Sequence, residues 1–125
     1  MRILIADDNE LVRSGVVRLL ASKQTWEVCG EATDGESAIL KARELLPDVI
    51  LLDISMPGIS GLEAARLLRQ QVPGVKILLI SQHDPAQFLA GALEAGAHAC
   101  LDKSRLGVDL LPAIETLGGS SAMQT

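Results

Sequence analysis

Short apolar runs alternate with amphipathic segments along the chain. The runs predicted to form strands are Ile3–Ala6, Trp26–Ala32, Val49–Leu52, Val75–Ile80 and Ala97–Leu101. The first and third runs, and residues 77–80 of the fourth, are apolar at every position, which is typical of strands in a parallel sheet covered by helices on both faces. The second run alternates apolar and polar residues, so we expect it at an edge of the sheet.

The segments between these runs place apolar residues at helical spacing. Three such sets are Val12, Val16, Leu19 and Leu20; Ala38, Ile39, Ala42, Leu45 and Leu46; and Leu110, Leu111, Ile114 and Leu117. Ser60 and Glu63 have the spacing of a capping box. Asp84 before Pro85 predicts a cap followed by the first residue of a helix, and Pro47 predicts the end of the second helix.

Strict alternation of strands and helices predicts a doubly wound α/β domain with five parallel strands and five helices. We place this domain at residues 1–117. The remaining residues, 118–125, contain glycine and serine and lack helical periodicity, so we expect them to form a linker or tail.

Composition limits the function further. The chain has 125 residues, 48% of them hydrophobic, and a net charge of −5. It shows neither a membrane-spanning apolar run nor the pattern of a secretion signal, so we expect a cytoplasmic protein. The acidic balance argues against DNA binding by this domain itself. Cys29 and Cys100 match no metal-binding spacing, and a cytoplasmic location predicts no disulfide between them.

Polar residues with chemical potential follow the strands. Asp7 and Asp8 follow the first strand, Asp53 ends the third, Ser81 follows the fourth and Lys103 follows the fifth. Ligands of open α/β sheets bind at this end of the strands. Three converging carboxylates repel each other by about 1 kcal/mol per pair at ~4 Å in water, and by more when partly buried. A divalent cation such as Mg²⁺, which prefers oxygen ligands, would relieve this repulsion.

Carboxylates, a metal, a lysine and a hydroxyl donor together suit phosphoryl transfer. The metal and Lys103 would neutralise charge on the phosphoryl oxygens, while Ser81 donates a hydrogen bond. One of the carboxylates would act as the nucleophile and form an aspartyl phosphate.

Four motifs carry a family resemblance: "ILIADDN", "LLDISMPGISG", "LLISQHD" and "ACLDKS". In this order and on these strands, they resemble the receiver domain of a bacterial two-component response regulator over residues 1–117. The segments "NELVRSGVVRLL", "EATDGESAI" and "GLEAARLLR" are similar to the NarL/FixJ-type group of LuxR-family regulators. The resemblance implies a flavodoxin-like (CheY-like) fold with strand order 2-1-3-4-5.

The resemblance also implies a metal site and a modified residue. Asp53 would accept a phosphoryl group from a sensor histidine kinase. Asp8 and Asp53 would bind Mg²⁺ directly, Asp7 would act through water, and Ser55 would supply its backbone carbonyl. Ser81 and Lys103 would bind the phosphoryl oxygens.

A signalling role follows from the same resemblance. Phosphorylation would change the surface formed by the fourth helix, the fifth strand and the fifth helix, and so promote a receiver homodimer or control an output domain. Relatives usually carry a DNA-binding helix-turn-helix for this purpose, so DNA would be a partner only through a domain that residues 1–125 do not include. The chain would be a switch that catalyses its own phosphorylation and dephosphorylation, and otherwise no enzyme. Cys100 stands where the family usually has an aromatic switch residue.

Three alternative functions remain to be weighed. A haloacid-dehalogenase-like phosphatase would need a second aspartate at the position of Ser55. A nucleotide or flavin binder would need a glycine-rich phosphate loop, and the sequence has none of the usual motifs. A receiver-like docking module that is never phosphorylated is the third, because Cys100 departs from the switch pattern.

Overall fold

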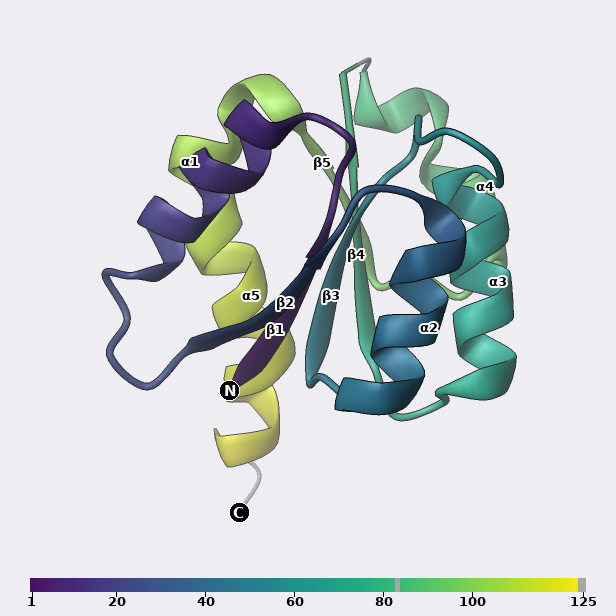
Figure 1. Ribbon diagram of the computed structural model, residues 1–125. Helices are drawn as coiled ribbons and strands as arrows, with labels where there is room; N and C mark the ends of the chain where they lie inside the picture. Colours follow the sequence, from purple (N-terminus) through teal and green to yellow (C-terminus); the bar gives the residue numbers. More distant parts are fainter. Residues whose placement is uncertain (83, 124–125) are drawn as a thin grey trace.

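The computed structural model describes residues 1–82 and 84–123. His83, which the sequence indicates as a solvated loop residue, lies outside these residues. A parallel sheet of five strands forms the centre of the fold, in the order β2-β1-β3-β4-β5 (Figure 1). The strands are β1 (Arg2–Ala6), β2 (Glu27–Ala32), β3 (Val49–Asp53), β4 (Lys76–Ser81) and β5 (Ala99–Asp102). The predicted flavodoxin-like topology and the edge position of β2 are therefore confirmed.

Helices cover both faces of the sheet (Figure 1). The α-helices are α1 (Glu10–Leu20), α2 (Gly35–Leu45), α3 (Gly61–Gln71), α4 (Leu89–Glu94) and α5 (Leu106–Met123), and two short 3-10 helices are η1 (Pro85–Gln87) and η2 (Lys103–Arg105). Helices α1 and α5 lie on one face, and α2, α3 and α4 lie on the other. Successive strand residues consequently enter two different cores: Ile3 and Ile5 pack with α1 and α5, whereas Leu4 packs with α2 and α3. This is why the central strands are apolar at every position.

The helix-start signal at Ser60 precedes an α-helix, whereas the signal at Asp84 precedes only a short 3-10 helix. Ser60 is the N-cap of α3, and its hydroxyl accepts a hydrogen bond from the Glu63 N–H at 3.2 Å. Asp84 does not begin an α-helix. Its carboxylate accepts from the Ala86 N–H at 3.0 Å and its carbonyl from the Gln87 N–H at 3.0 Å, which closes the 3-10 turn η1. Helix α4 begins only at Leu89.

Helices α2 and α5 compare differently with their predicted ends. Helix α2 ends at Leu45, two residues before Pro47, as the sequence predicts. Leu46 takes the left-handed conformation with φ 49°. Helix α5 runs to Met123, past the predicted end at residue 117. At Gly118 the helix lies so close to the Met1 side chain that an added Cβ would displace it, so the helix backbone at this residue packs against the start of the chain. The linker role of 118–125 stays a prediction, and residues 124–125 lie outside the described part.

Among the described residues, the search for a helix both long and apolar enough to cross a bilayer finds none. Cys29 and Cys100 are free thiols on the two edge strands β2 and β5. The prediction that these two residues form no disulfide therefore agrees with the structure.

Candidate functional site: an acidic pocket at the carboxyl end of the sheet

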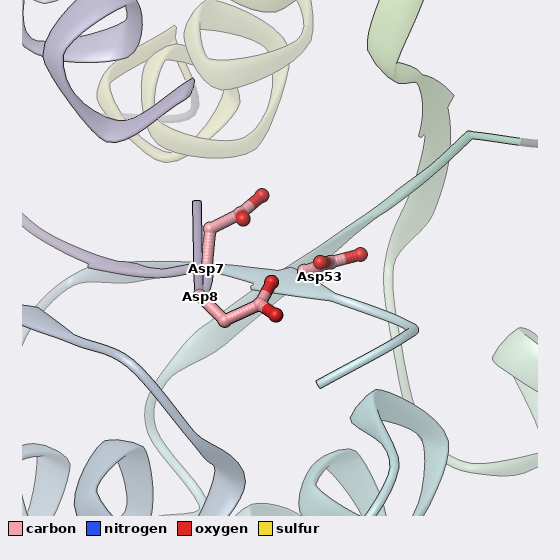
Figure 2. Close-up of side chains that lie close together, drawn as sticks. All are labelled: Asp7, Asp8 and Asp53. Carbon is pink, nitrogen blue, oxygen red and sulfur yellow. The ribbon is translucent and has the colours of Figure 1, made fainter. Parts of the chain in front are cut away.

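Three aspartates from neighbouring strands meet at the carboxyl end of the sheet (Figure 2). Asp7 and Asp8 follow β1, and Asp53 is the last residue of β3, the strand beside it. One carboxylate oxygen from each lies within 4.8 Å of the others. Asp7 and Asp53 are buried and Asp8 is exposed, so the cluster opens to solvent on the side of Asp8.

Hydrogen bonds hold Asp7 at three of its polar atoms. Its N–H donates to the Ala32 carbonyl at 3.0 Å, which extends the β1–β2 pairing by one residue. Its Oδ1 accepts from the Asn9 N–H at 2.8 Å, and its carbonyl accepts from Arg13 Nη1 at 2.7 Å. Only Oδ2 remains, and this oxygen is directed toward the pocket and Lys103.

Asn9 connects the pocket to the start of α1. Its Oδ1 accepts hydrogen bonds from the N–H groups of Leu11 and Val12, at 2.9 and 3.2 Å, and so caps the helix. The positive end of the α1 dipole therefore lies close to the acidic pair Asp7 and Asp8.

Lys103 lies between two of the carboxylates. Its Nζ is 2.8 Å from Asp7 Oδ2 and 3.1 Å from Asp53 Oδ2. The contact to Asp53 is a hydrogen bond, whereas the contact to Asp7 is a close ion pair without hydrogen-bond alignment. Burial acts to lower the pKa of Lys103, but the close contacts with the negative charges of Asp7 and Asp53 together outweigh it, so this pKa is raised. The ammonium therefore stays charged at neutral pH.

For Asp53, in contrast to Lys103, the surroundings disfavour the charged form. Its side chain is buried at the end of β3, where burial raises the pKa of the carboxyl and the nearby Asp7 charge adds to this effect. The Ser55 N–H, which donates to Oδ1 at 3.1 Å, and Lys103, which donates to Oδ2, act against the rise without cancelling it. Without a further cation, the ionised form of Asp53 is held at a cost in free energy.

The pocket fits a hard divalent cation. The buried Asp7 Oδ2 has no hydrogen-bond partner among the described residues, although its charge is opposed by Lys103. An orphaned carboxylate oxygen grouped with two other carboxylates matches the oxygen ligands that Mg²⁺ takes, and the open side at Asp8 leaves room for the waters that Mg²⁺ keeps. Asp7, Asp8 and Asp53 are the residues that could hold the metal. The role of the Ser55 carbonyl stays a prediction.

The remaining predicted residues border the pocket on the side of β4 and β5. Ser81 is buried at the end of β4 and pairs in register with Asp102, the residue before Lys103. Cys100 is partly buried two residues earlier in β5, opposite Leu79, on the face covered by α2, α3 and α4. Burial raises the pKa of its thiol, so it stays protonated at neutral pH. Cys100 therefore fills a small apolar position beside the core.

Sequence reasoning missed two residues of this site. Asn9 and Arg13 both contact Asp7, yet neither was singled out. A signal for Asn9 was present, because an asparagine directly before a helical pattern is a common N-cap. Arg13 gave no comparable signal, since an arginine within an amphipathic helix usually faces solvent.

Comparison with known proteins agrees with this geometry. Residues 3–115 match the family model described as response regulator receiver domain. The response regulator GacA of Pseudomonas protegens is 44% identical over 103 residues, which are 82% of this chain and 48% of GacA. The response regulator UvrY of Escherichia coli is 38% identical over 94% of this chain and 54% of UvrY. The chain thus spans about half the length of these curated relatives.

Solved structures show the same relationship. A LuxR-family two-component response regulator from Aurantimonas sp. superposes with a TM-score of 0.88 and 37% identity, over 94% of this chain and 85% of that one. RcsB of Salmonella enterica serovar Typhimurium, solved on promoter rprA with the phosphomimetic BeF3⁻, gives 0.85 and 25% identity, over 94% of this chain and 98% of that one. The chain therefore belongs to the response regulator receiver domains, and its relatives are regulators of the LuxR family, the NarL/FixJ type.

Proposed function

We propose that this domain is a phosphorylation-dependent switch in which Asp53 accepts a phosphoryl group from a sensor histidine kinase with the help of Mg²⁺. The observation that carries this proposal is the position of Asp53. It ends a buried strand, beside two further carboxylates and in hydrogen-bond contact with Lys103.

The residues would share the chemistry as follows. A carboxylate oxygen of Asp53 attacks phosphorus, a P–O bond forms, and the bond between phosphorus and the donor imidazole nitrogen breaks. Bound Mg²⁺ would supply positive charge to the phosphoryl oxygens. Lys103 would exchange its contact with Asp53 Oδ2 for a phosphoryl oxygen, and Ser81 would donate its hydroxyl to another. The raised pKa of Asp53 fits a site that is incomplete until a second cation joins Lys103.

The output would be read from the surface formed by α4, β5 and α5. Phosphorylation would replace the single negative charge of the Asp53 carboxylate with a phosphoryl group that carries up to about two, and pulling Ser81 and Lys103 inward would shift the chain segments that follow them. Leu89 and Leu93 of α4 are 46% and 54% exposed, and Val108 of α5 is 65% exposed. Such apolar side chains would suit contact with a second receiver or with an output domain. Cys100 is too small to act as the aromatic switch residue usual in the family, so the readout would depend on the backbone of α4.

The partners in the whole protein follow from the relatives. RcsB was solved bound to promoter DNA, and the chain covers about half of GacA and UvrY. We infer that the full-length protein controls transcription through a DNA-binding output domain, because this acidic receiver is itself unsuited to DNA.

Intact-protein mass spectrometry after incubation with acetyl phosphate tests the proposal. The wild type is expected to gain one phosphoryl group in the presence of Mg²⁺ and little with EDTA. Asp53→Ala is expected to gain none under either condition. Asp102→Ala is a matched control, because Asp102 is a strand-end aspartate whose carboxylate accepts hydrogen bonds from the N–H and hydroxyl of Ser104.

Absence of the adduct from a folded wild type would overturn the proposal. The acidic pocket would then serve a receiver-like docking module that works without phosphorylation. Modification of Asp53→Ala at the wild-type level would instead place the acceptor elsewhere in the chain.

A further inference from the structure

Arg13, the fourth residue of α1, contacts the backbone of the acidic pair. Its Nη1 donates to the carbonyl of Asp7 at 2.7 Å, and its Nε donates to Glu31 Oε1 at 2.9 Å. The Arg13 side chain is 14% exposed, whereas that of Glu31 is 46% exposed. Arg13 is therefore held in place between two acceptors rather than extended into solvent.

Glu31 lies near the end of β2 and is held from a second direction. Lys41 of α2 donates to the Glu31 backbone carbonyl. The Glu31 side chain thus presents a defined partner to Arg13 from the neighbouring strand. This arrangement links α1, β1 and β2 at the edge of the pocket.

The hydrogen bond from Arg13 to the Asp7 carbonyl also affects the backbone of Asp8. The peptide unit between these two residues is planar, so the direction of the Asp7 carbonyl also sets the direction in which the chain enters Asp8. Asp8 is the exposed carboxylate of the cluster, and within the described part of the chain no hydrogen bond or ion pair holds its side chain. The position of the Asp8 carboxylate therefore depends on the backbone that carries it.

We propose that Arg13 is a positioning residue for the metal ligands: it fixes the peptide between Asp7 and Asp8 so that both carboxylates face the cation. This inference rests on the proposed function, since it requires that the pocket bind Mg²⁺. Arg13 itself touches neither the metal nor the phosphoryl group.

Simple electrostatics predicts the opposite result. Arg13 is a cation near an acidic pocket, so its removal would leave Glu31 unpaired and make the surroundings more negative. If charge alone mattered, Arg13→Met would bind Mg²⁺ more tightly than the wild type. If positioning matters, the same variant binds Mg²⁺ more weakly. The sign of the change therefore separates the two explanations.

Isothermal titration with MgCl2 tests the proposal. Arg13→Met is expected to raise the Kd for Mg²⁺ about 10-fold, the size typical of residues that orient metal ligands. The double variant Arg13→Met/Glu31→Gln restores the local net charge and is expected to keep most of this loss. Arg13→Lys keeps the charge, but one ammonium cannot replace the guanidinium fork, so we expect only partial recovery. Arg66→Met, which breaks the exposed pair with Glu63 on α3, is the matched control and should bind like the wild type.

Each outcome decides one question. A Kd within twofold of the wild type, or a tighter one, in Arg13→Met would overturn the inference and leave the proposed function intact. No Mg²⁺ binding by the wild type would overturn both. A role confined to stability would lower the free energy of unfolding but leave the Kd of the folded variant unchanged, so urea unfolding is measured alongside. If Arg13→Met does not fold, Arg13→Lys decides by the same criterion.

Discussion

The pocket is bordered by two regions that are built differently. The first, which we call the pocket frame, consists of β1, β3 and the first turns of α1 and α3. The second, the α4–β5 region, spans Leu89–Asp102. Helices α1 and α3 have 11 residues each and begin with side-chain caps at Asn9 and Ser60. Helix α4 has six residues, and its N-cap Phe88 makes no side-chain cap hydrogen bond to the helix.

The same contrast appears in burial. Strand β3 is buried along its whole length, whereas all four residues of β5 are partly exposed. Helix α4 buries Ala92 but leaves Leu89 and Leu93 largely exposed. Segments with few buried apolar contacts open at a lower free energy than core strands. The comparison indicates a frame that fixes the chemistry and a weakly held region that can respond to it.

The largest predicted effect comes from breaking the frame at Gly61. A Cβ at this first residue of α3 would lie 2.4 Å from the Asp53 carbonyl oxygen and 2.7 Å from Ile54 Cα. Since both are backbone atoms, Gly61→Ala must displace the end of β3 or the start of α3. We expect a loss of about 2–3 kcal/mol in the free energy of unfolding, measured by urea unfolding, and weaker phosphorylation of Asp53.

Gly15→Ala is the matched control for this change. Gly15 lies in the exposed middle of α1, and a Cβ there meets nothing within 4 Å. We expect this substitution to stabilise the protein by about 0.5–1 kcal/mol, because alanine favours the helix. Equal behaviour of the two variants would show that the close approach at Gly61 does not constrain the frame.

How far the sequence predicted this frame depends on the kind of interaction. The apolar strands were predictable because burial on both faces requires apolar residues at every position. The acidic residues were predictable because they stand directly at the ends of these apolar runs. The cap at Ser60 was predictable for the same reason. The bonds of Asn9 and Arg13 to Asp7 were not identified, because they join side chains to the backbone of a loop.

The errors lie mainly outside the frame. Asp84 before Pro85 predicted a cap and a helix start, and both are present, but the helix is the 3-10 helix η1 and α4 begins four residues beyond Pro85. Helix α5 continues through Gly118, where the chain packs against Met1. The first outcome depends on competition between 3-10 and α-helical hydrogen bonds, and the second on tertiary packing. Neither can be predicted from the spacing of apolar residues alone.

A smaller effect is expected from the charge of Asp53. Burial raises the pKa of this carboxyl, so the folded protein binds its proton more tightly than the unfolded chain. The free energy of unfolding of the wild type therefore falls as the pH rises from the ordinary value of 3.8 through the raised pKa. Asp53→Asn cannot ionise and is spared this loss.

Without Mg²⁺, Asp53→Asn is accordingly expected to be more stable than the wild type at pH 7, with a difference that shrinks as the pH falls toward 4. Urea unfolding from pH 4 to pH 7 measures this difference. Added Mg²⁺ should stabilise the wild type more than the variant. A difference that stays constant with pH would contradict the account of a charge held at a cost in the frame.

Hydrogen exchange measured by mass spectrometry, on the wild type held phosphorylated by excess acetyl phosphate and Mg²⁺, tests the central claim most directly. Mg²⁺ alone and Asp53→Ala with both reagents are the controls. We predict that phosphorylation changes exchange in peptides covering α4 and β5, while those covering β1 and α1 change little beyond the effect of Mg²⁺. A phosphorylated protein whose changes are confined to β1 and α1, or that shows none in α4 and β5, would contradict the division between a fixed frame and a responsive region.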